Sequence, residues 1–147
     1  SDVAADRPTS ECRVERLDRA QLEGEQRRVF EAIAAGPRGD VALIFHALLR
    51  VPALADRVQQ LGALLRYSSG LAPAQSELVI LATARFWDCR YEWEHHVRAA
   101  RAAGLGEEAI AAIADGTPMK LAPDEALLRD VTLALLQSGR LPDALHE

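Results

Sequence analysis

Ionisable and apolar side chains recur at helical spacing between Cys89 and Ala103. Advancing about 100° per residue places Cys89, Glu92, Trp93 and His96 on one stripe of a helix. The opposite face carries charged side chains suited to solvent, namely Arg90, Glu94, Arg98 and Arg101. We therefore expect the stripe that bears Glu92 and His96 to face inward, where these two side chains are i,i+4 neighbours that can touch.

A second carboxylate, Glu77, lies on another face that is otherwise apolar, with Ile80, Leu81 and Ala84 at its i+3, i+4 and i+7 positions. An inward glutamate costs several kcal/mol unless it finds a proton, a cation or hydrogen-bond donors. If the two faces pack together, Glu77, Glu92, His96 and Cys89 converge. Neighbouring carboxylates would then stabilise a histidinium between them, an arrangement typical of acid–base chemistry.

Structural interpretations compete with this one. An inward Glu–His pair is often only a satisfied core pair, and Glu77, near a helix start, can simply stabilise that end. Cys89 is typical of a small buried apolar residue as much as of a nucleophile. Trp93, with Trp87 and Tyr91, forms either an aromatic core cluster or the wall of a substrate pocket.

The other histidines carry less information. His95 points about 100° away from His96 and suits a surface or an interface. His46 stays open between a core and a ligand role. A metal site would need Glu92 and His96 joined by Glu77 or His46, but no HExxH-type pattern fixes such a set, so we expect no metal ligands.

Composition limits the partners. Of the 147 residues, 49% are hydrophobic and 27% charged, typical of a globular domain with a packed core. The net charge of −5, without a cluster of Lys or Arg, argues against nucleic acid and membrane surfaces. The two cysteines, Cys12 and Cys89, make no disulfide framework. We expect a cytoplasmic protein with a small-molecule substrate.

The elements that must position these residues are all helices. The periodicity predicts an all-α bundle of about seven helices with short connections. The first begins at Asp18 with a capping-box-like Gln21 and ends at Gly36-Pro37. Residues 74–103 contain neither Gly nor Pro, and we expect a break near Phe86–Asp88. The other predicted helices cover residues 41–48, 52–65, 107–114 and 123–136.

The two ends of the chain differ from the bundle. Residues 1–16 show no sustained period and are expected to form a flexible arm, which leaves residues 17–147 as a single domain. Leu141–Leu145 looks like the start of a further helix that the remaining residues are too few to complete. We therefore expect that a terminal helix is missing.

The motif Tyr91-Glu92-Trp93-Glu94-His95-His96, read as Y-E-W-x-x-H, resembles the carboxymuconolactone decarboxylase family, whose superfamily includes the alkyl hydroperoxidase D-like proteins. The resemblance covers roughly residues 25–138. It extends to Ala99-Ala100, Gly104-Leu105, Gly36-Pro37-Arg38-Gly39, the R-x-P-x-L-A pattern from Arg50, and residues 76–81.

The resemblance implies an all-helical fold that assembles as a homotrimer or homohexamer. It also implies, for the peroxidase branch, a C-x-x-C-x-x-x-H motif with a relay glutamate on the preceding helix. Cys89, His96 and Glu77 match that pattern, but Glu92 stands where the second cysteine should be. A carboxylate cannot replace a thiolate nucleophile, which counts against peroxidase activity.

The decarboxylase branch implies a reaction without a cofactor, in which a lactone acid loses carbon dioxide and the resulting dienolate is protonated. Glu92 and His96 would transfer the proton and Glu77 would orient His96. Arg38, in the P-R-G loop, is the candidate anion holder, ahead of Arg66 and Arg85. Cys89 and Trp93 would contact substrate.

Our leading hypothesis is thus a cofactor-independent lyase or isomerase that acts on a small lactone or carboxylated ring compound. A thiol peroxidase that uses Cys89 and a non-catalytic small-molecule-binding protein are the alternatives.

Overall fold

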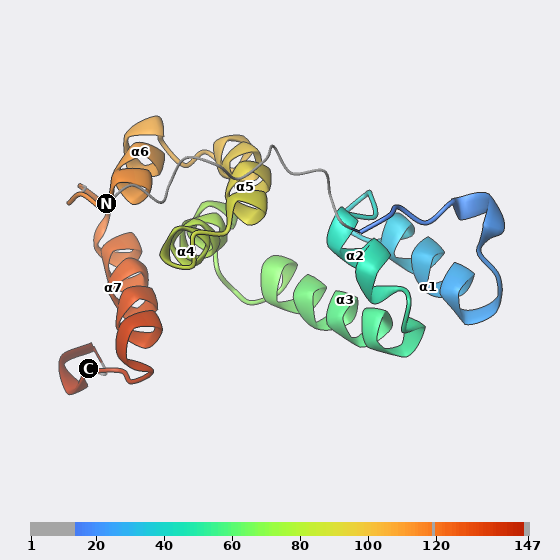
Figure 1. Cartoon of the computed structure of the whole chain (residues 1–147). Helices are drawn as coiled ribbons and strands as arrows, with labels where there is room; N and C mark the ends of the chain where they lie inside the picture. Colours follow the sequence, from blue (N-terminus) through green and yellow to red (C-terminus); the bar gives the residue numbers. More distant parts are fainter. Residues whose placement is uncertain (1–13, 119, 146–147) are drawn as a thin grey trace, which may run out of the picture. The chain divides into compact units, whose positions relative to one another are not determined.

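The structure, a computed structural model, describes residues 14–118 and 120–145. All regular structure in these residues is helical, so the predicted all-α class with seven α-helices is confirmed (Figure 1). The chain forms two compact units, one ending at Ser69 and the other beginning at Gly70. None of the described helices has the length and apolarity needed to cross a membrane.

The first unit contains a short 3-10 turn, η1 (Arg19–Gln21), and the helices α1 (Gly24–Ala35), α2 (Leu43–Leu48) and α3 (Pro52–Tyr67). Pro52 occupies the first turn of α3, where its missing N–H costs nothing. The core of this unit is built around Val29, Ile33 and Leu49, which are almost fully buried.

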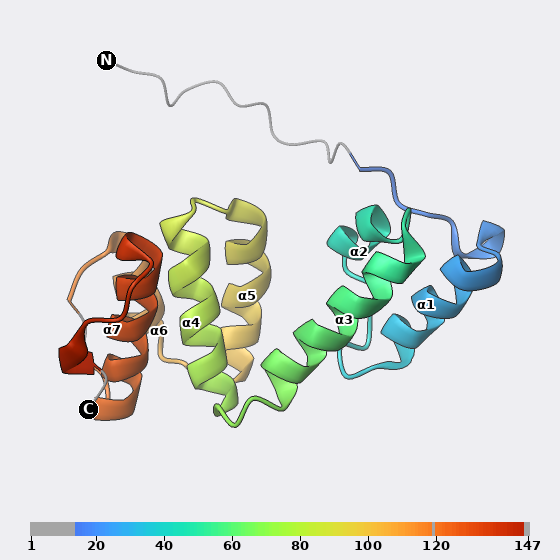
Figure 2. The ribbon, with the colours of Figure 1, turned by 90° about the horizontal axis from the view of Figure 1, so that it is seen from below.

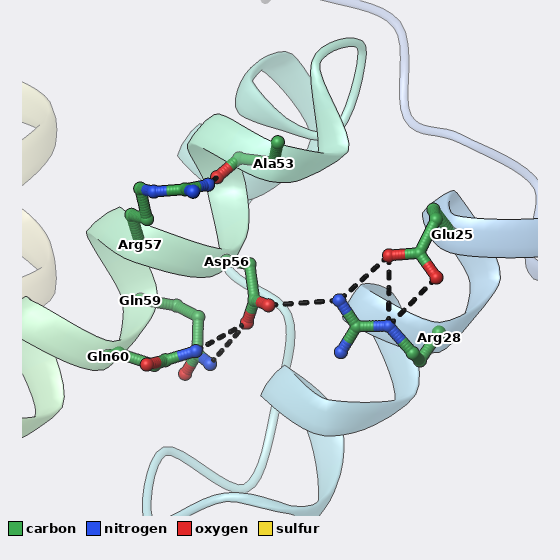
Figure 3. Close-up of polar contacts among 7 residues, drawn as sticks. All are labelled: Glu25, Arg28, Ala53, Asp56, Arg57, Gln59 and Gln60. Atoms are coloured by element: carbon green, nitrogen blue, oxygen red, sulfur yellow. Dashed lines mark hydrogen bonds and ion pairs between the residues drawn. The ribbon is translucent and has the colours of Figure 1, made fainter.

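A polar network joins α1 to α3 on the surface of this unit (Figure 3). The Arg28 guanidinium donates to Glu25 in its own helix, at 2.9 Å, and to Asp56 in α3, at 3.0 Å. Asp56 also accepts hydrogen bonds from Gln59 and Gln60. Gln59 and Gln60 belong to α3 itself, so the bond from Arg28 is the contact of this network that ties Asp56 to α1.

The second unit consists of α4 (Pro73–Phe86), α5 (Arg90–Ala102), α6 (Glu107–Asp115), α7 (Pro123–Ser138) and a 3-10 turn, η2 (Asp143–Leu145). Helix α4 is central: it packs against α5, α6 and α7, and it lies beside α5 and α7 in Figure 2. Leu78 and Leu81 of α4 are fully buried and meet Ala100 of α5 and Ile113 of α6 in the core of this unit.

Two predicted helix boundaries are wrong. Asp18 does not start a long helix: its carboxylate accepts from the N–H of Ala20, only two residues on, and caps η1 alone. Leu22 is extended and Gly24 has φ +50°, so the chain turns before α1 begins. At the other end, the predicted start of a helix is the 3-10 turn η2.

The predicted arm, residues 1–16, lies outside the described residues except for its last three. That residues 17–147 form a single domain remains a prediction.

Candidate functional site

The turn between α4 and α5 positions the candidate site. Asp88 has φ +49°, a left-handed conformation that ends α4, and the N–H of Cys89 bonds the carbonyl of Ala84 at 2.8 Å. The predicted break near residues 86–88 is therefore confirmed. Because so short a connection makes the two helices antiparallel, Glu77 in the first half of α4 comes opposite His96 in the middle of α5.

His96 lies between two carboxylates, as the spacing predicted. Its Nδ1 is 2.7 Å from Oε2 of Glu77, and its Nε2 is 3.3 Å from Oε2 of Glu92. The stripe assignment is also confirmed: His96 and Ala100 are buried, whereas Arg90, Glu94, Arg98 and Arg101 are exposed.

Glu77, His96 and Glu92, which we call the triad, differ in how far their side chains are buried. The Glu77 and His96 side chains are only 6% and 9% exposed, while that of Glu92 is 35% exposed. A buried carboxylate held on an imidazole nitrogen does more than favour a helix start, so the simple end-stabilising interpretation of Glu77 does not hold. Glu92 is the member that a solute can reach.

The geometry restricts where protons reside. An ionised Glu77 accepts from Nδ1–H, which fixes the ring orientation and leaves Nε2 toward Glu92. One proton shared between Nε2 and the Glu92 carboxylate then gives either an imidazolium with a carboxylate or a neutral imidazole with a carboxylic acid. In both forms a proton donor and a proton acceptor lie 3.3 Å apart, an arrangement that can serve general acid–base catalysis.

Cys89 and Trp93 line one groove of the second unit, with a volume of about 370 Å³. They flank Glu92 on α5, and Cys89 is a free, partly buried thiol. Arg85 of α4 and Arg90 of α5 line the same groove. Periodicity alone assigned Arg90 to the solvent face. Its place as the first residue of α5, next to Cys89, is the sequence signal that could have placed it at the groove.

Arg38 lies in the first unit, whereas the triad lies in the second. Its guanidinium lies 5.1 Å from the centre of the Phe45 ring, and a Cβ at Gly62 would come within 2.5 Å of one Nη. Its Nε is buried without a hydrogen-bond partner in the described residues. An unsatisfied buried donor of this kind is unusual and leaves the guanidinium with capacity for an acceptor.

The remaining histidines do not join the site. His46 is buried in the first unit, where its Nδ1 accepts from the N–H of Leu17 at 2.9 Å and its ring packs edge-on against Phe30. His95 is exposed, as predicted, with its ring edge-on to His96. In the described part of the chain, no group of three or more His, Cys, Asp or Glu is arranged to hold a metal ion.

Comparison with known proteins identifies the family. No curated protein and no solved structure gives a match. The model of the carboxymuconolactone decarboxylase family matches residues 52–134, which runs from the start of α3 into the second half of α7 and is narrower than the range 25–138 that the motifs suggested. The match spans more than half of the chain and includes Glu77, Glu92 and His96, so the protein belongs to the carboxymuconolactone decarboxylase family.

Proposed function

We propose that the protein is a cofactor-independent lyase or isomerase that acts on a small lactone or carboxylated ring compound. The observation that carries this proposal is the contact of His96 with Glu77 on one ring nitrogen and with the more exposed Glu92 on the other. Membership of the family suggests a decarboxylase-like or alkyl hydroperoxidase D-like activity, and the triad favours the first.

In the decarboxylase form of this reaction, the bond between the ring carbon and the carboxylate breaks and carbon dioxide leaves. The electron pair of the broken bond passes into the lactone carbonyl to give a dienolate, and a proton is then added to a carbon atom of that dienolate. Glu92 delivers that proton because it is the exposed member of the triad. His96 returns a proton to Glu92, and Glu77 holds the ring in position.

Two further features support an anionic substrate. Arg85 and Arg90 border the groove that Cys89 and Trp93 line, together with the single carboxylate of Asp88, and Arg90 also pairs with Glu94 at 2.6 Å. Arg38 remains the proposed anion holder on the strength of its unsatisfied Nε. Arg38→Gln, Arg85→Gln and Arg90→Gln, compared one by one, test which arginine holds the anion: the variant that loses the anion holder should have a raised KM for the carboxylated lactone, and the other two should keep the wild-type KM.

Turnover tests the assignment of the triad. The probe is carboxymuconolactone itself, together with a small panel of lactone acids, and the readout is the release of carbon dioxide. Glu92→Gln and His96→Gln should lower kcat by about 10² to 10⁴-fold while circular dichroism keeps its helical signal. Glu108→Gln, at an exposed position of α6, is the control and should keep the wild-type rate.

A second candidate function, thiol peroxidase, is favoured by the partial exposure of Cys89 in its groove. The carboxylate at position 92 argues against it, because no second thiol stands there. Peroxide consumption with a dithiol reductant, compared between the wild type and Cys89→Ser, tests whether the protein is a thiol peroxidase. Thiol-dependent turnover that is lost in the variant would support the peroxidase and contradict the lyase proposal.

Thermal stabilisation by a lactone acid without any product would instead favour a non-catalytic binding protein.

Assembly as a homotrimer or homohexamer is part of the same proposal. Its support is the apolar face of α3, where the side chains exposed by 38% to 58% include Leu54, Val58, Leu61, Leu64 and Leu65. The narrower placement, a Y-E-W-x-x-H subgroup without the C-x-x-C pair, likewise stays an interpretation of the sequence.

A further inference from the structure

A larger cleft lies elsewhere in the second unit, between α4, α6 and α7. Its volume is about 580 Å³, and it is lined mainly by apolar side chains, among them Ala82, Phe86, Ile113 and Leu133. Clefts of a few hundred Å³ with mostly apolar walls are typical of small-molecule sites. None of Glu77, Glu92 and His96 lines it.

The charged side chains of this cleft are two arginines and one aspartate. The Arg85 Nε donates to the carbonyl of Ala114 at 2.6 Å, which anchors the guanidinium at the end of α6 and offsets the carbonyl dipoles there. Arg129, whose side chain is 25% exposed, pairs with Asp130 at 2.7 Å through Nη2. Asp130 balances the charge of Arg129, so the lining of the cleft carries one unbalanced positive charge, that of Arg85, although the net charge of the chain is −5.

We propose that this cleft binds a monocarboxylate with an apolar body, separately from the triad. The apolar walls on α4, α6 and α7 take the body, and Arg85 and Arg129 take the carboxylate. An acceptor with a full negative charge fits better than a neutral one, because it balances the unpaired guanidinium. The inference does not depend on the reaction that the triad performs.

The test compares decanoate with decanamide as probes, using isothermal calorimetry on the full chain. Decanoate should bind at least about tenfold more tightly than decanamide, because the amide keeps the apolar body and loses the charge. Equal affinity of the two probes, or no binding of decanoate up to millimolar concentration, would overturn the proposal.

Variants locate the binding site. Arg129→Gln should weaken decanoate binding about tenfold, whereas Arg98→Gln, an exposed arginine on α5, should leave the Kd unchanged. Trp93→Leu separates this cleft from the Cys89 groove, since Arg85 borders both but Trp93 borders only the groove. Loss of binding in Trp93→Leu with binding retained in Arg129→Gln would assign the ligand to the groove and contradict the proposal. Glu92→Gln should bind decanoate as the wild type does, even if its turnover is lost.

Discussion

At the scale of single residues, the account depends on one buried contact between a carboxylate and an imidazole. Glu77 and His96 are both nearly inaccessible, so each satisfies a polar group that would otherwise be buried without a partner. Glu92 is different because about a third of its side chain meets solvent. The pair therefore has a structural role as well as a proposed chemical one, and substitutions can separate the two.

Replacement of Glu77 separates them. Glu77→Ala leaves Nδ1 of His96 buried without its acceptor and should lower the free energy of unfolding by about 1 to 3 kcal/mol. Glu77→Gln keeps an acceptor oxygen without the charge, so most of this stability should return while turnover stays low. Urea unfolding and kcat, measured on both variants, check this. If Glu77→Gln restores turnover along with stability, the charge of Glu77 has no role in catalysis.

His46 should make stability depend on pH near neutrality. Burial, and to a lesser degree Arg16, lower the pKa of His46 from its ordinary value. The folded state then binds fewer protons than the unfolded state at this site. The stabilisation is therefore complete above the unfolded pKa of about 6.5 and is lost as the pH falls below it.

Urea unfolding at pH 7.5 and pH 5.5 measures the effect of His46. His46→Gln should be less stable than the wild type at pH 7.5 and should show a smaller loss between the two pH values. His95→Gln, in which an exposed histidine is replaced, is the control and should keep the wild-type loss. A loss in His46→Gln as large as that of the wild type would show that other groups cause it.

At the scale of elements, antiparallel packing of α4 and α5 brings Glu77 to His96, and this contact could be predicted from the sequence. The i,i+4 spacing of Glu92 and His96 and the apolar face around Glu77 predicted the contact. The groove lined by Cys89 could not be predicted from the sequence, because Arg85 and Arg90 line it from two helices whose relative rotation the periodicity does not fix. The 3-10 turn η1 was also not predicted. Asp18 can cap either a long helix or a single turn, and a capping carboxylate alone does not show which of the two follows.

The tie between α1 and α3 should weaken in acid. The Arg28 guanidinium, followed by Gln60 and Gln59, lowers the pKa of Asp56 to about 2. A carboxylate with a depressed pKa stabilises the fold above its unfolded pKa, about 3.9, and loses that contribution as the pH falls toward 2.

Asp56→Asn tests the tie between these helices. The variant should be less stable than the wild type at pH 6, because it loses the charged acceptor of Arg28, and the gap should narrow as the pH falls to 3. Urea midpoints at the two pH values measure it. A gap that is the same at both would mean that the charge of Asp56 contributes nothing to the packing of α1 and α3.

At the scale of the whole molecule, the apolar face of α3 is the feature that the packing inside the first unit does not explain. Helical periodicity predicted α3 well but could not distinguish a face that is buried inside the chain from one that is buried between subunits. Arg38 raises the same difficulty, since the sequence places it only by its P-R-G motif. A homo-oligomer, which the resemblance to the family implied, would bury the apolar face of α3 between subunits. The mass of the protein in solution tests this proposal directly.

Leu61→Glu should dissociate the assembly, because it places a charge in the middle of the exposed apolar stripe. Size-exclusion chromatography with light scattering should give the mass of a trimer or hexamer for the wild type and a smaller mass for the variant. Ala53→Glu is the control: Ala53 is exposed in the first turn of α3, where a carboxylate is tolerated. A monomeric wild type would contradict the oligomer proposal.

The measurement that tests the central claim most directly is turnover of carboxymuconolactone in deuterated water. We predict that the wild type releases carbon dioxide and gives a product with one deuterium on carbon. Glu92→Gln and His96→Gln should lose at least about 99% of this rate, whereas the exposed control Glu108→Gln should keep it. Wild-type rates in both triad variants would contradict the account. So would a wild-type protein that leaves every lactone acid of the panel untouched while consuming peroxide with a dithiol.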